Sequence, residues 1–182
     1  TDYDEASDSW LHERTFGSSE YARTILNRLW GTPPNIAVSY DARVHRVLGT
    51  LAESGLISSA SDVGDGGLAV ALAEASFRAG LGMRVDLERL GLNASTTVQL
   101  FGETACRLLL TCPRTALSQV ESIVSESRLA GLKNIGSVTG NSLEILSYGS
   151  KLISSTIADL KQPWSSALES HLHDQTAAEV LA

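Results

Sequence analysis

The residues best suited to chemistry lie in a short glycine-rich stretch, D-V-G-D-G-G, which begins at Asp62 and holds two acidic residues and three glycines. Gly66 and Gly67 allow the backbone to take a positive φ and to approach another group closely. The apolar sequence from Leu68 onward predicts a helix, whose first N–H groups and dipole favour an anion such as phosphate. We predict that the N–H groups from Asp65 to Leu68 bind a phosphate, and that Asp62 or Asp65 holds a magnesium ion or its waters.

A second interpretation of the same stretch stays open. Glycine-rich connections between a strand and a helix are common, and an aspartate can cap the helix with nothing bound. In that case the stretch is a turn with a structural role alone.

Further charged residues lie on the predicted helix and downstream of it. Glu103 and Arg107 are four residues apart across the entry to a predicted strand, on the same side. They form either a structural ion pair, which we favour, or a site in which Arg107 faces a phosphate and Glu103 orients it. Glu74, late in the apolar helix, is expected to pair with a basic residue or a helix end.

Histidines and cysteines form no catalytic or metal-binding set. The four histidines are scattered on polar segments, at His12, His45, His171 and His173. Neither Cys106 nor Cys112 has a nearby histidine to activate it, and no serine–histidine–acid order suggests hydrolysis. We expect both cysteines to be buried thiols on one face of a strand, reduced in the cytoplasm.

Composition excludes several classes of protein. The chain has 182 residues, a net charge of -7 and a pI near 5.0, which argue against nucleic acid as the main partner. No stretch of about 18 uninterrupted apolar residues predicts a membrane span, and the acidic N-terminus is no signal peptide. We therefore expect a cytoplasmic protein.

Apolar periodicity predicts alternating helices and strands. Helices are expected at residues 20–30 (capped by Ser18 or Ser19), at 40–54, from the glycine-rich turn to about 79, and at 113–127, 156–161 and 164–172. Strands are expected at 56–60 and 83–87, at 106–112 as a central strand, at 133–138 and 143–146 as a hairpin around the turn 139–142, and at 151–154. An irregular loop with some helical turn is expected at 92–97.

This pattern predicts an α/β or α+β domain, a mixed sheet with helices packed on it. We expect residues 16–172 to form the domain, with a polar segment at 1–15 before it and a polar tail at 173–182. Because Thr1 is not a natural start, we expect the sequence to be a piece of a longer polypeptide.

Five short motifs in this order resemble the C-terminal domain of the ATP-using synthetases related to aminoimidazole ribonucleotide synthetase, and among them the phosphoribosylformylglycinamidine synthases. Each motif alone is weak, but their common order and spacing make the resemblance specific, over residues 15 to 172. The motifs are F-G-S-S-E-Y at 16–21, the proline pair 33–34, the stretch 61–74, L-F-G-E-T-A-C-R at 100–107 and I-G-S-V-T-G at 135–140.

The resemblance implies the fold of that C-terminal domain and a share in the fourth step of purine synthesis. In that step formylglycinamide ribonucleotide becomes its amidine, with ATP and with ammonia from glutamine. It implies ATP or ADP and magnesium as cofactors, with phosphate contacts at Asp65, Gly66, Gly67, Leu68 and Arg107 and structural support from Ser18, Glu74 and Glu103. The implied partners are the N-terminal domains of the same polypeptide, a glutaminase subunit or domain and a small-molecule substrate. We expect the isolated chain to be catalytically inert, because those N-terminal domains hold the catalytic nucleotide.

Three positions depart from the family pattern. Gly64 and Gly102 stand where a hydroxyl residue is common, and Ser61 stands where histidine is frequent. The loss of these polar groups suggests a weakened nucleotide site. Two alternatives stay open. One is a sister enzyme, such as selenophosphate synthetase, thiamine-monophosphate kinase or a hydrogenase maturation factor. The other, which the loss of the hydroxyl groups favours, is a non-catalytic ligand-binding or scaffold module.

Overall fold

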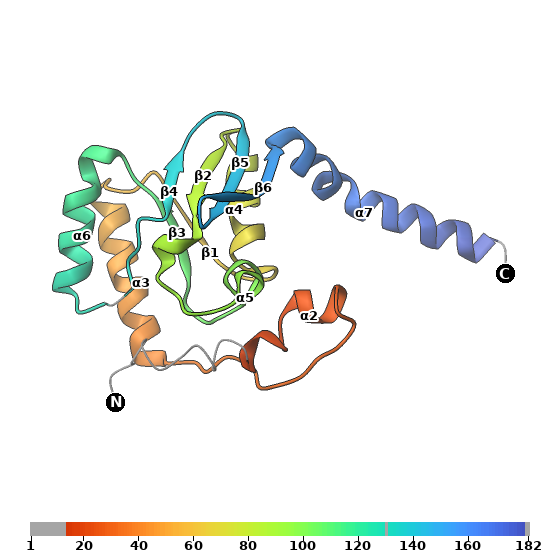
Figure 1. Ribbon diagram of the computed structural model, residues 1–182, viewed down its shortest axis with the longest axis horizontal. Coiled ribbons are helices and arrows are strands. Elements are labelled where there is room, and N and C mark those ends of the chain that lie inside the picture. The colour runs from red at the N-terminus through yellow and green to blue at the C-terminus, as the bar shows by residue number, and fades with distance from the viewer. Residues whose placement is uncertain (1–13, 130, 181–182) are drawn as a thin grey trace.

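The computed structural model describes residues 14–129 and 131–180 of the chain. They form a four-stranded sheet and a two-stranded ribbon, with helices packed against both (Figure 1). This arrangement confirms the predicted mixed sheet with helices packed on it. In chain order the elements are α2 (Glu20–Thr24), α3 (Val38–Glu53), β1 (Ser59–Asp62), α4 (Gly67–Phe77), β2 (Met83–Asp86), the 3-10 helix η2 (Leu87–Leu90), α5 (Thr96–Phe101), β3 (Leu108–Thr111), the 3-10 helix η3 (Arg114–Ala116), α6 (Leu117–Glu126), β4 (Gly136–Val138), β5 (Ser142–Ser147), β6 (Ser150–Thr156) and α7 (Ile157–Val180).

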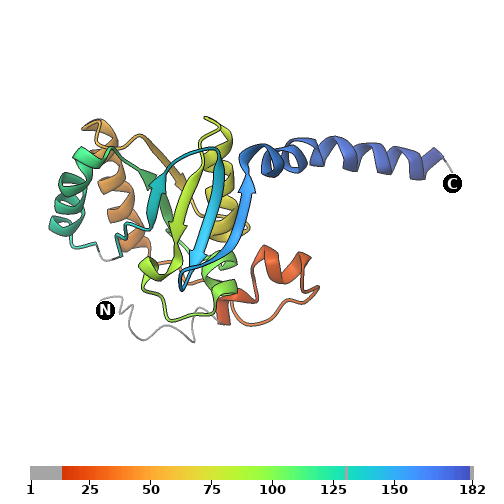
Figure 2. The ribbon, with the colours of Figure 1, turned by 45° about the horizontal axis from the view of Figure 1, so that its top comes forward.

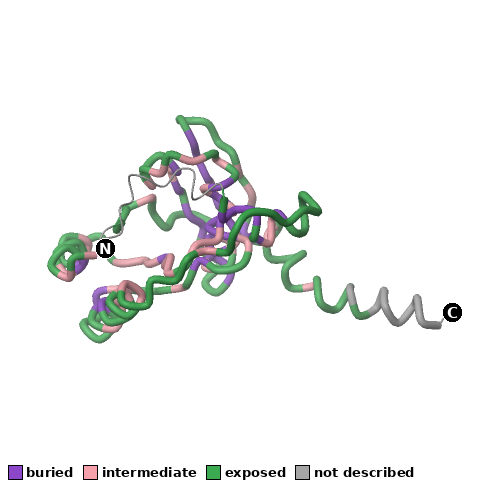
Figure 3. The backbone as a smooth tube through the Cα atoms, turned by 90° about the horizontal axis from the view of Figure 1, so that it is seen from below, coloured by how far each residue is buried: buried purple, intermediate pink, exposed green. Residues whose placement is uncertain are grey.

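The four-stranded sheet has the order β4-β2-β5-β6. β2 runs parallel to β5 and antiparallel to β4, and β5 runs antiparallel to β6. Alternation along β2 buries Met83 and Val85 and leaves Arg84 exposed. Val85 lies opposite Ile145 of β5, and both pack in one core with Leu72 of α4, which is 1% exposed. Figure 3 shows the buried residues gathered at this centre of the molecule. The main core thus fixes α4, and with it the turn that precedes α4.

The hairpin predicted around the turn at 139–142 is wrong. β4 and β5 do not pair with each other, because β2 lies between them. Gly82, just before β2, donates its N–H to the carbonyl of Gly140 (2.9 Å). The turn at 139–142 therefore lies beside the start of β2. β5 and β6 form a hairpin instead, around Tyr148 and Gly149, which both have a positive φ as a type I′ turn requires.

The ribbon pairs β1 with β3 antiparallel. Ala60 lies opposite Leu110, and Asp62 lies opposite Leu108. The strand predicted at 106–112 is therefore not central, since β3 pairs with β1 alone within the described residues. The ribbon is covered by α3 and α6, which lie side by side (Figures 1 and 2). Their shared core consists of Val47, Leu51, Leu56, Val120 and Val124.

The helix predicted at 20–30 is wrong beyond its first turn. Ser19 caps it as expected, because its Oγ accepts the N–H of Ala22 (3.3 Å). The chain then turns back: Asn27 has a φ of 51°, and Trp30 donates its N–H to the carbonyl of Gly17 (3.1 Å). Ile25, Leu26 and Leu29, which have helical spacing in the sequence, are exposed as a result.

Two other helices differ from the expectation. α5 begins at the end of the loop predicted at 92–97 and continues through residues for which no element was predicted, and Ser95 caps it at the N–H of Val98 (3.4 Å). α7 continues through Pro163, where two separate helices were predicted. It leaves the body of the molecule and projects outward (Figures 1 and 2). No helix of the described chain is long and apolar enough to cross a membrane.

Candidate functional site

The glycine-rich turn joins β1 to α4. Gly66 and Gly67 have φ values of 81° and 66°, which confirms the positive φ predicted for both. A Cβ on Gly67 would lie 2.8 Å from the carbonyl oxygen of Leu100 in α5, and a Cβ on Gly66 would clash with Val70. The turn therefore requires glycine at both positions, for backbone conformation and for space.

Glu103 provides the acceptor at the start of α4. Its Oε1 accepts the N–H of Gly66 (2.8 Å) and the N–H of Glu20 at the start of α2 (2.9 Å). No hydrogen bond of the described residues joins the side chain of Asp62 or Asp65 to this turn, so the aspartate cap is absent. A carboxylate from 37 residues away takes its place.

Arg107 holds the loop that carries Glu103. The favoured Glu103–Arg107 ion pair is wrong, because it is not among the ion pairs of the described residues. Instead, Nη1 of Arg107 donates to the carbonyl of Gly102 (3.1 Å). Burial lowers the pKa of the Arg107 guanidinium. The partly buried side chain thus stabilises the turn between α5 and β3.

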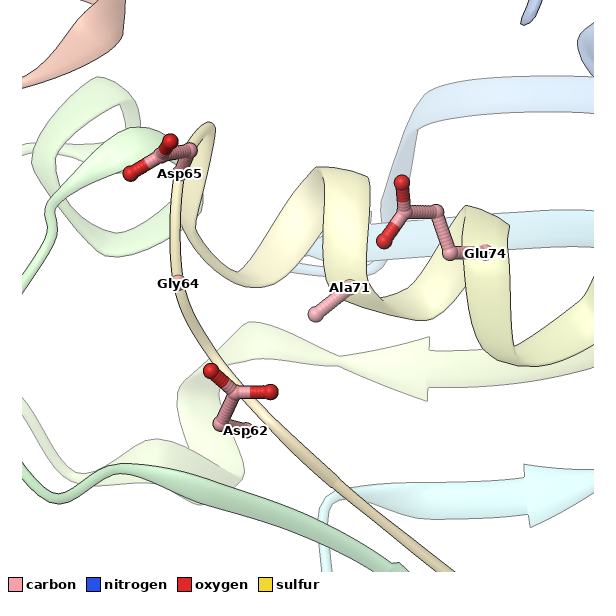
Figure 4. Close-up of a pocket in the computed structure, with 5 residues that line it drawn as sticks. All are labelled: Asp62, Gly64, Asp65, Ala71 and Glu74. Carbon is pink, nitrogen blue, oxygen red and sulfur yellow. The ribbon is translucent and has the colours of Figure 1, made fainter.

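An open depression of about 330 Å³ lies beside the glycine-rich turn. Its lining is Asp62, Gly64, Asp65, Ala71 and Glu74. Figure 4 shows Asp62 and Asp65 on either side of Gly64, with Ala71 and Glu74 along α4, and the Asp65 carboxylate points away from α4. The depression is thus lined by three acidic residues and by no basic side chain, with the Asp65 carboxylate turned away from α4.

This lining fits a hydrated cation better than a bare phosphate, because three negative charges repel a further anion. Within the described part of the chain, no three histidine, cysteine or acidic residues come close enough to hold a metal ion. Magnesium commonly keeps several waters and binds one or two carboxylates together with nucleotide phosphates. Asp62 and Asp65 could therefore hold magnesium through water, with a nucleotide completing its ligands.

A basic side chain lies outside the lining, on α2. Arg23 pairs with Glu20 across one helical turn, and its pKa is raised first by that hydrogen bond and then, among other causes, by the charge of Asp65. Glu20 is thus the direct partner of Arg23, and the charge of Asp65 raises the pKa of Arg23 to a smaller extent.

Of the other predicted site residues, Glu74 lines the depression, whereas Leu68 and Ser18 do not. Leu68 is buried, so only its backbone faces the turn. The Ser18 hydroxyl donates to the carbonyl of Thr15 (2.8 Å). Glu74 accepts the indole N–H of Trp164 from α7 (3.0 Å), so the expectation of a basic or helix-end partner is wrong. Sequence reasoning missed this contact and the bond from Glu103 to Gly66. Spacing along the chain carries no signal for either, because 90 and 37 residues separate the partners.

The two cysteines do not share a face of one strand. Cys106 precedes β3 and has a φ of 58°, while Cys112 follows β3. Both are free thiols, as expected, and both are partly buried.

One protein family matches residues 33–148, the greater part of the chain, and it is described as "AIR synthase related protein, C-terminal domain". The chain belongs to this family. The AIR synthase related C-terminal domain includes the glycine-rich turn, α4, α5 and the loop with Glu103 within the matched residues.

Among curated proteins, the chain is similar to the phosphoribosylformylglycinamidine synthase subunit PurL of Alkaliphilus metalliredigens. The two are 29% identical over 153 residues, which make up 84% of this chain and 20% of the relative. The chain thus spans about a fifth of the length of the relative it matches.

Solved structures share the fold. PurL of Thermotoga maritima, solved with ATP and with FGAR, has a TM-score of 0.58 in both cases, at 23% and 21% identity. The matches cover 65% and 66% of this chain and 21% and 20% of PurL. E. coli HypE, a hydrogenase maturation protein, has a TM-score of 0.55 at 18% identity and covers 79% of this chain and 46% of its own.

Proposed function

We propose that this AIR synthase related C-terminal domain is part of a phosphoribosylformylglycinamidine synthase. The similarity to PurL over 84% of the chain is the observation that carries the proposal. The reaction is the conversion of formylglycinamide ribonucleotide to its amidine. ATP supplies a phosphoryl group that activates the amide oxygen, and ammonia then displaces phosphate.

In this proposal the domain contributes to a nucleotide and magnesium site at the glycine-rich turn. Asp62 and Asp65 face the cation through its waters, which the acidic lining of the depression supports. Phosphate is assigned to the N–H groups between Asp65 and Leu68, of which Gly66 donates to Glu103 and Gly67 to the carbonyl of Gly64 (3.0 Å) in this structure, and Arg107 supports the loop behind them. The complexes of Thermotoga maritima PurL with ATP and ADP support nucleotide as the ligand class.

The proposed partners are the N-terminal domains of the same polypeptide and a glutaminase that delivers ammonia. The isolated domain is then inactive, because a C-terminal domain alone lacks the surfaces that hold the catalytic nucleotide. We place the protein in the cytoplasm, where free thiols such as Cys106 and Cys112 stay reduced.

ADP release tests this function. The protein at its natural length is offered formylglycinamide ribonucleotide with ammonia, and in parallel selenide or thiamine monophosphate. We expect release that requires both the purine precursor and ammonia. Release with another acceptor would assign the domain to a sister enzyme instead.

A scaffold role is the second candidate function. Gly64 and Gly102 offer no hydroxyl where the family commonly has one, and a Cβ at Gly102 would meet the carbonyl oxygen of Val98 at 2.5 Å. A domain of this kind would support the parent enzyme without binding nucleotide itself. Unchanged ADP release in a Gly66→Val variant that remains folded would favour this role.

A further inference from the structure

One carboxylate oxygen joins the starts of two helices. Oε1 of Glu103 accepts the N–H of Gly66, the residue before α4, at 2.8 Å. It also accepts the N–H of Glu20, the first residue of α2, at 2.9 Å. Both amides belong to the group at a helix start that has no partner within the helix, and a negative charge is most favourable there.

Two hydrogen bonds hold the backbone at Gly102, the residue before Glu103. The N–H of Gly102 donates to the carbonyl of Val98 (2.8 Å), and the carbonyl of Gly102 accepts the Arg107 guanidinium (3.1 Å). A Cβ at position 102 has no room beside Val98. The Glu103 side chain is therefore presented from a backbone that is held at Gly102.

The α2 side of this junction packs on the α5 side. Tyr21 stacks on Phe101 with the ring centroids 4.7 Å apart, and it also contacts Phe16 at 5.7 Å. Phe101 is the last residue of α5 and stands two positions before Glu103. Ring contact and hydrogen bond thus hold α2 at the same place as the glycine-rich turn.

We propose that Glu103 is a positioning residue that sets the glycine-rich turn and α2 together through this shared oxygen. The proposal deepens the proposed function and rests on it, because the Gly66 amide is one of those assigned to phosphate. A phosphate that takes the Gly66 amide displaces the Glu103 carboxylate, since both anions need the same donor. Displacement also removes the acceptor of Glu20, so binding at the turn loosens the start of α2.

A proline at position 20 isolates this link. Glu20→Pro removes the backbone N–H that donates to Glu103, and it also removes the Glu20 side chain. It places proline at the first position of a helix, where proline is well tolerated. Ser19 has φ and ψ of -75° and 158°, which suit a residue before proline. Glu20→Ala is the matched control, because it also loses the side-chain bond to Arg23 but keeps the N–H.

Hydrogen–deuterium exchange at single amides, in the protein at its natural length, is the measurement. We expect Gly66 to exchange at least about 10-fold faster in Glu20→Pro and within about twofold of the parent in Glu20→Ala. Glu103→Ala should free both amides, and Glu103→Gln should restore most of the protection, because its amide oxygen still accepts. Equal Gly66 exchange in Glu20→Pro and Glu20→Ala would overturn the proposal.

Adding ADP with magnesium tests the displacement of Glu103. If Glu103 had a structural role alone, the nucleotide would not change hydrogen–deuterium exchange at Glu20. We expect slower exchange at Gly66 together with faster exchange at Glu20. Protection of Gly66 while Glu20 stays unchanged would contradict displacement of Glu103. ADP release in the acceptor assay is a separate measurement, so failure of this link and failure of the proposed function are distinguishable.

Discussion

At the scale of single residues, the turn depends on glycine for two separable reasons. Gly67 has a φ of 66° and no room for a Cβ, whereas Gly80, just after α4, has a φ of 63° and nothing within 4 Å of a Cβ. The pair shares one backbone conformation and differs in the space around it. Comparing the two positions therefore separates conformational strain from steric exclusion.

Gly67→Ala should be much more destabilising than Gly80→Ala. The left-handed conformation alone costs about 1–2 kcal/mol for alanine. Overpacking against the backbone of Leu100 and Phe101 adds about 1–3 kcal/mol at position 67. Urea unfolding followed by circular dichroism measures both variants. Equal losses of unfolding free energy at the two positions would show that the space around Gly67 does not matter.

The thiol of Cys106 should react slowly. Burial, and then the hydrogen bond and charge of the Asp41 carboxylate, raise its pKa to about 11 from the ordinary 9.0. Near pH 8 this lowers the thiolate fraction about a hundredfold, and the thiolate is the reactive form. Alkylation followed by mass spectrometry should find Cys106 labelling that increases as the pH is raised toward 11. Asp41→Asn should speed the labelling, and labelling in the folded parent at the unfolded rate would contradict the account.

Residue-scale features that depend on local conformation could be predicted from the sequence. The positive φ of Gly66 and Gly67 and the cap at Ser19 are of this kind, because the chemistry of one or two neighbours decides them. The partners of Glu103 and Glu74 could not be predicted. They come from α2, the glycine-rich turn and α7, and only the packing of these elements brings the side chains together.

At the scale of elements, α7 is attached to α4 by a small set of contacts. The ring of Trp164 lies 5.2 Å from that of Phe77, and its indole N–H donates to Glu74. Lys161 donates its Nζ to the carbonyl of Phe77 (3.3 Å). These contacts lie on both sides of Pro163, so they hold the first part of α7 in place across the proline.

Trp164→Ala should lower the free energy of unfolding by about 1–3 kcal/mol, the sum of one aromatic pair and one hydrogen bond. Trp164→Phe should recover most of the loss, because it keeps the ring contact and gives up only the bond to Glu74. Leu168→Ala, at a more exposed position of α7, is the control and should change stability little. Thermal unfolding compares the three variants, and equal effects of Trp164→Ala and Leu168→Ala would mean that Trp164 does not attach α7.

The positions of elements along the chain were easier to predict than their pairing. Helices α3, α4 and α6 and strands β2, β5 and β6 lie close to where periodicity predicts them. Pairing depends on contacts between distant segments, so the insertion of β2 between β4 and β5 left no local pattern. The early end of α2 has a similar cause. The chain turns back onto Gly17 through Trp30, and this tertiary contact overrides the helical spacing of the apolar residues.

At the scale of the whole molecule, one segment leaves much apolar surface uncovered. The large apolar residues after α2 are strongly exposed, among them Ile25 (63%), Leu29 (61%), Ile36 (72%) and Val38 (75%). A segment with this many exposed apolar side chains is suited to contact with another protein surface. This agrees with the proposed N-terminal domains as partners, and the segment follows directly on the helix that Glu103 holds.

Formation of the amidine product by the protein at its natural length tests the central claim most directly. Nitrogen-labelled ammonia, ATP and formylglycinamide ribonucleotide are supplied together, and the product is analysed by mass spectrometry. The account predicts labelled formylglycinamidine ribonucleotide that requires ATP and falls sharply in a folded Gly66→Val variant. Folded protein that releases no labelled amidine under these conditions would contradict the assignment to phosphoribosylformylglycinamidine synthase.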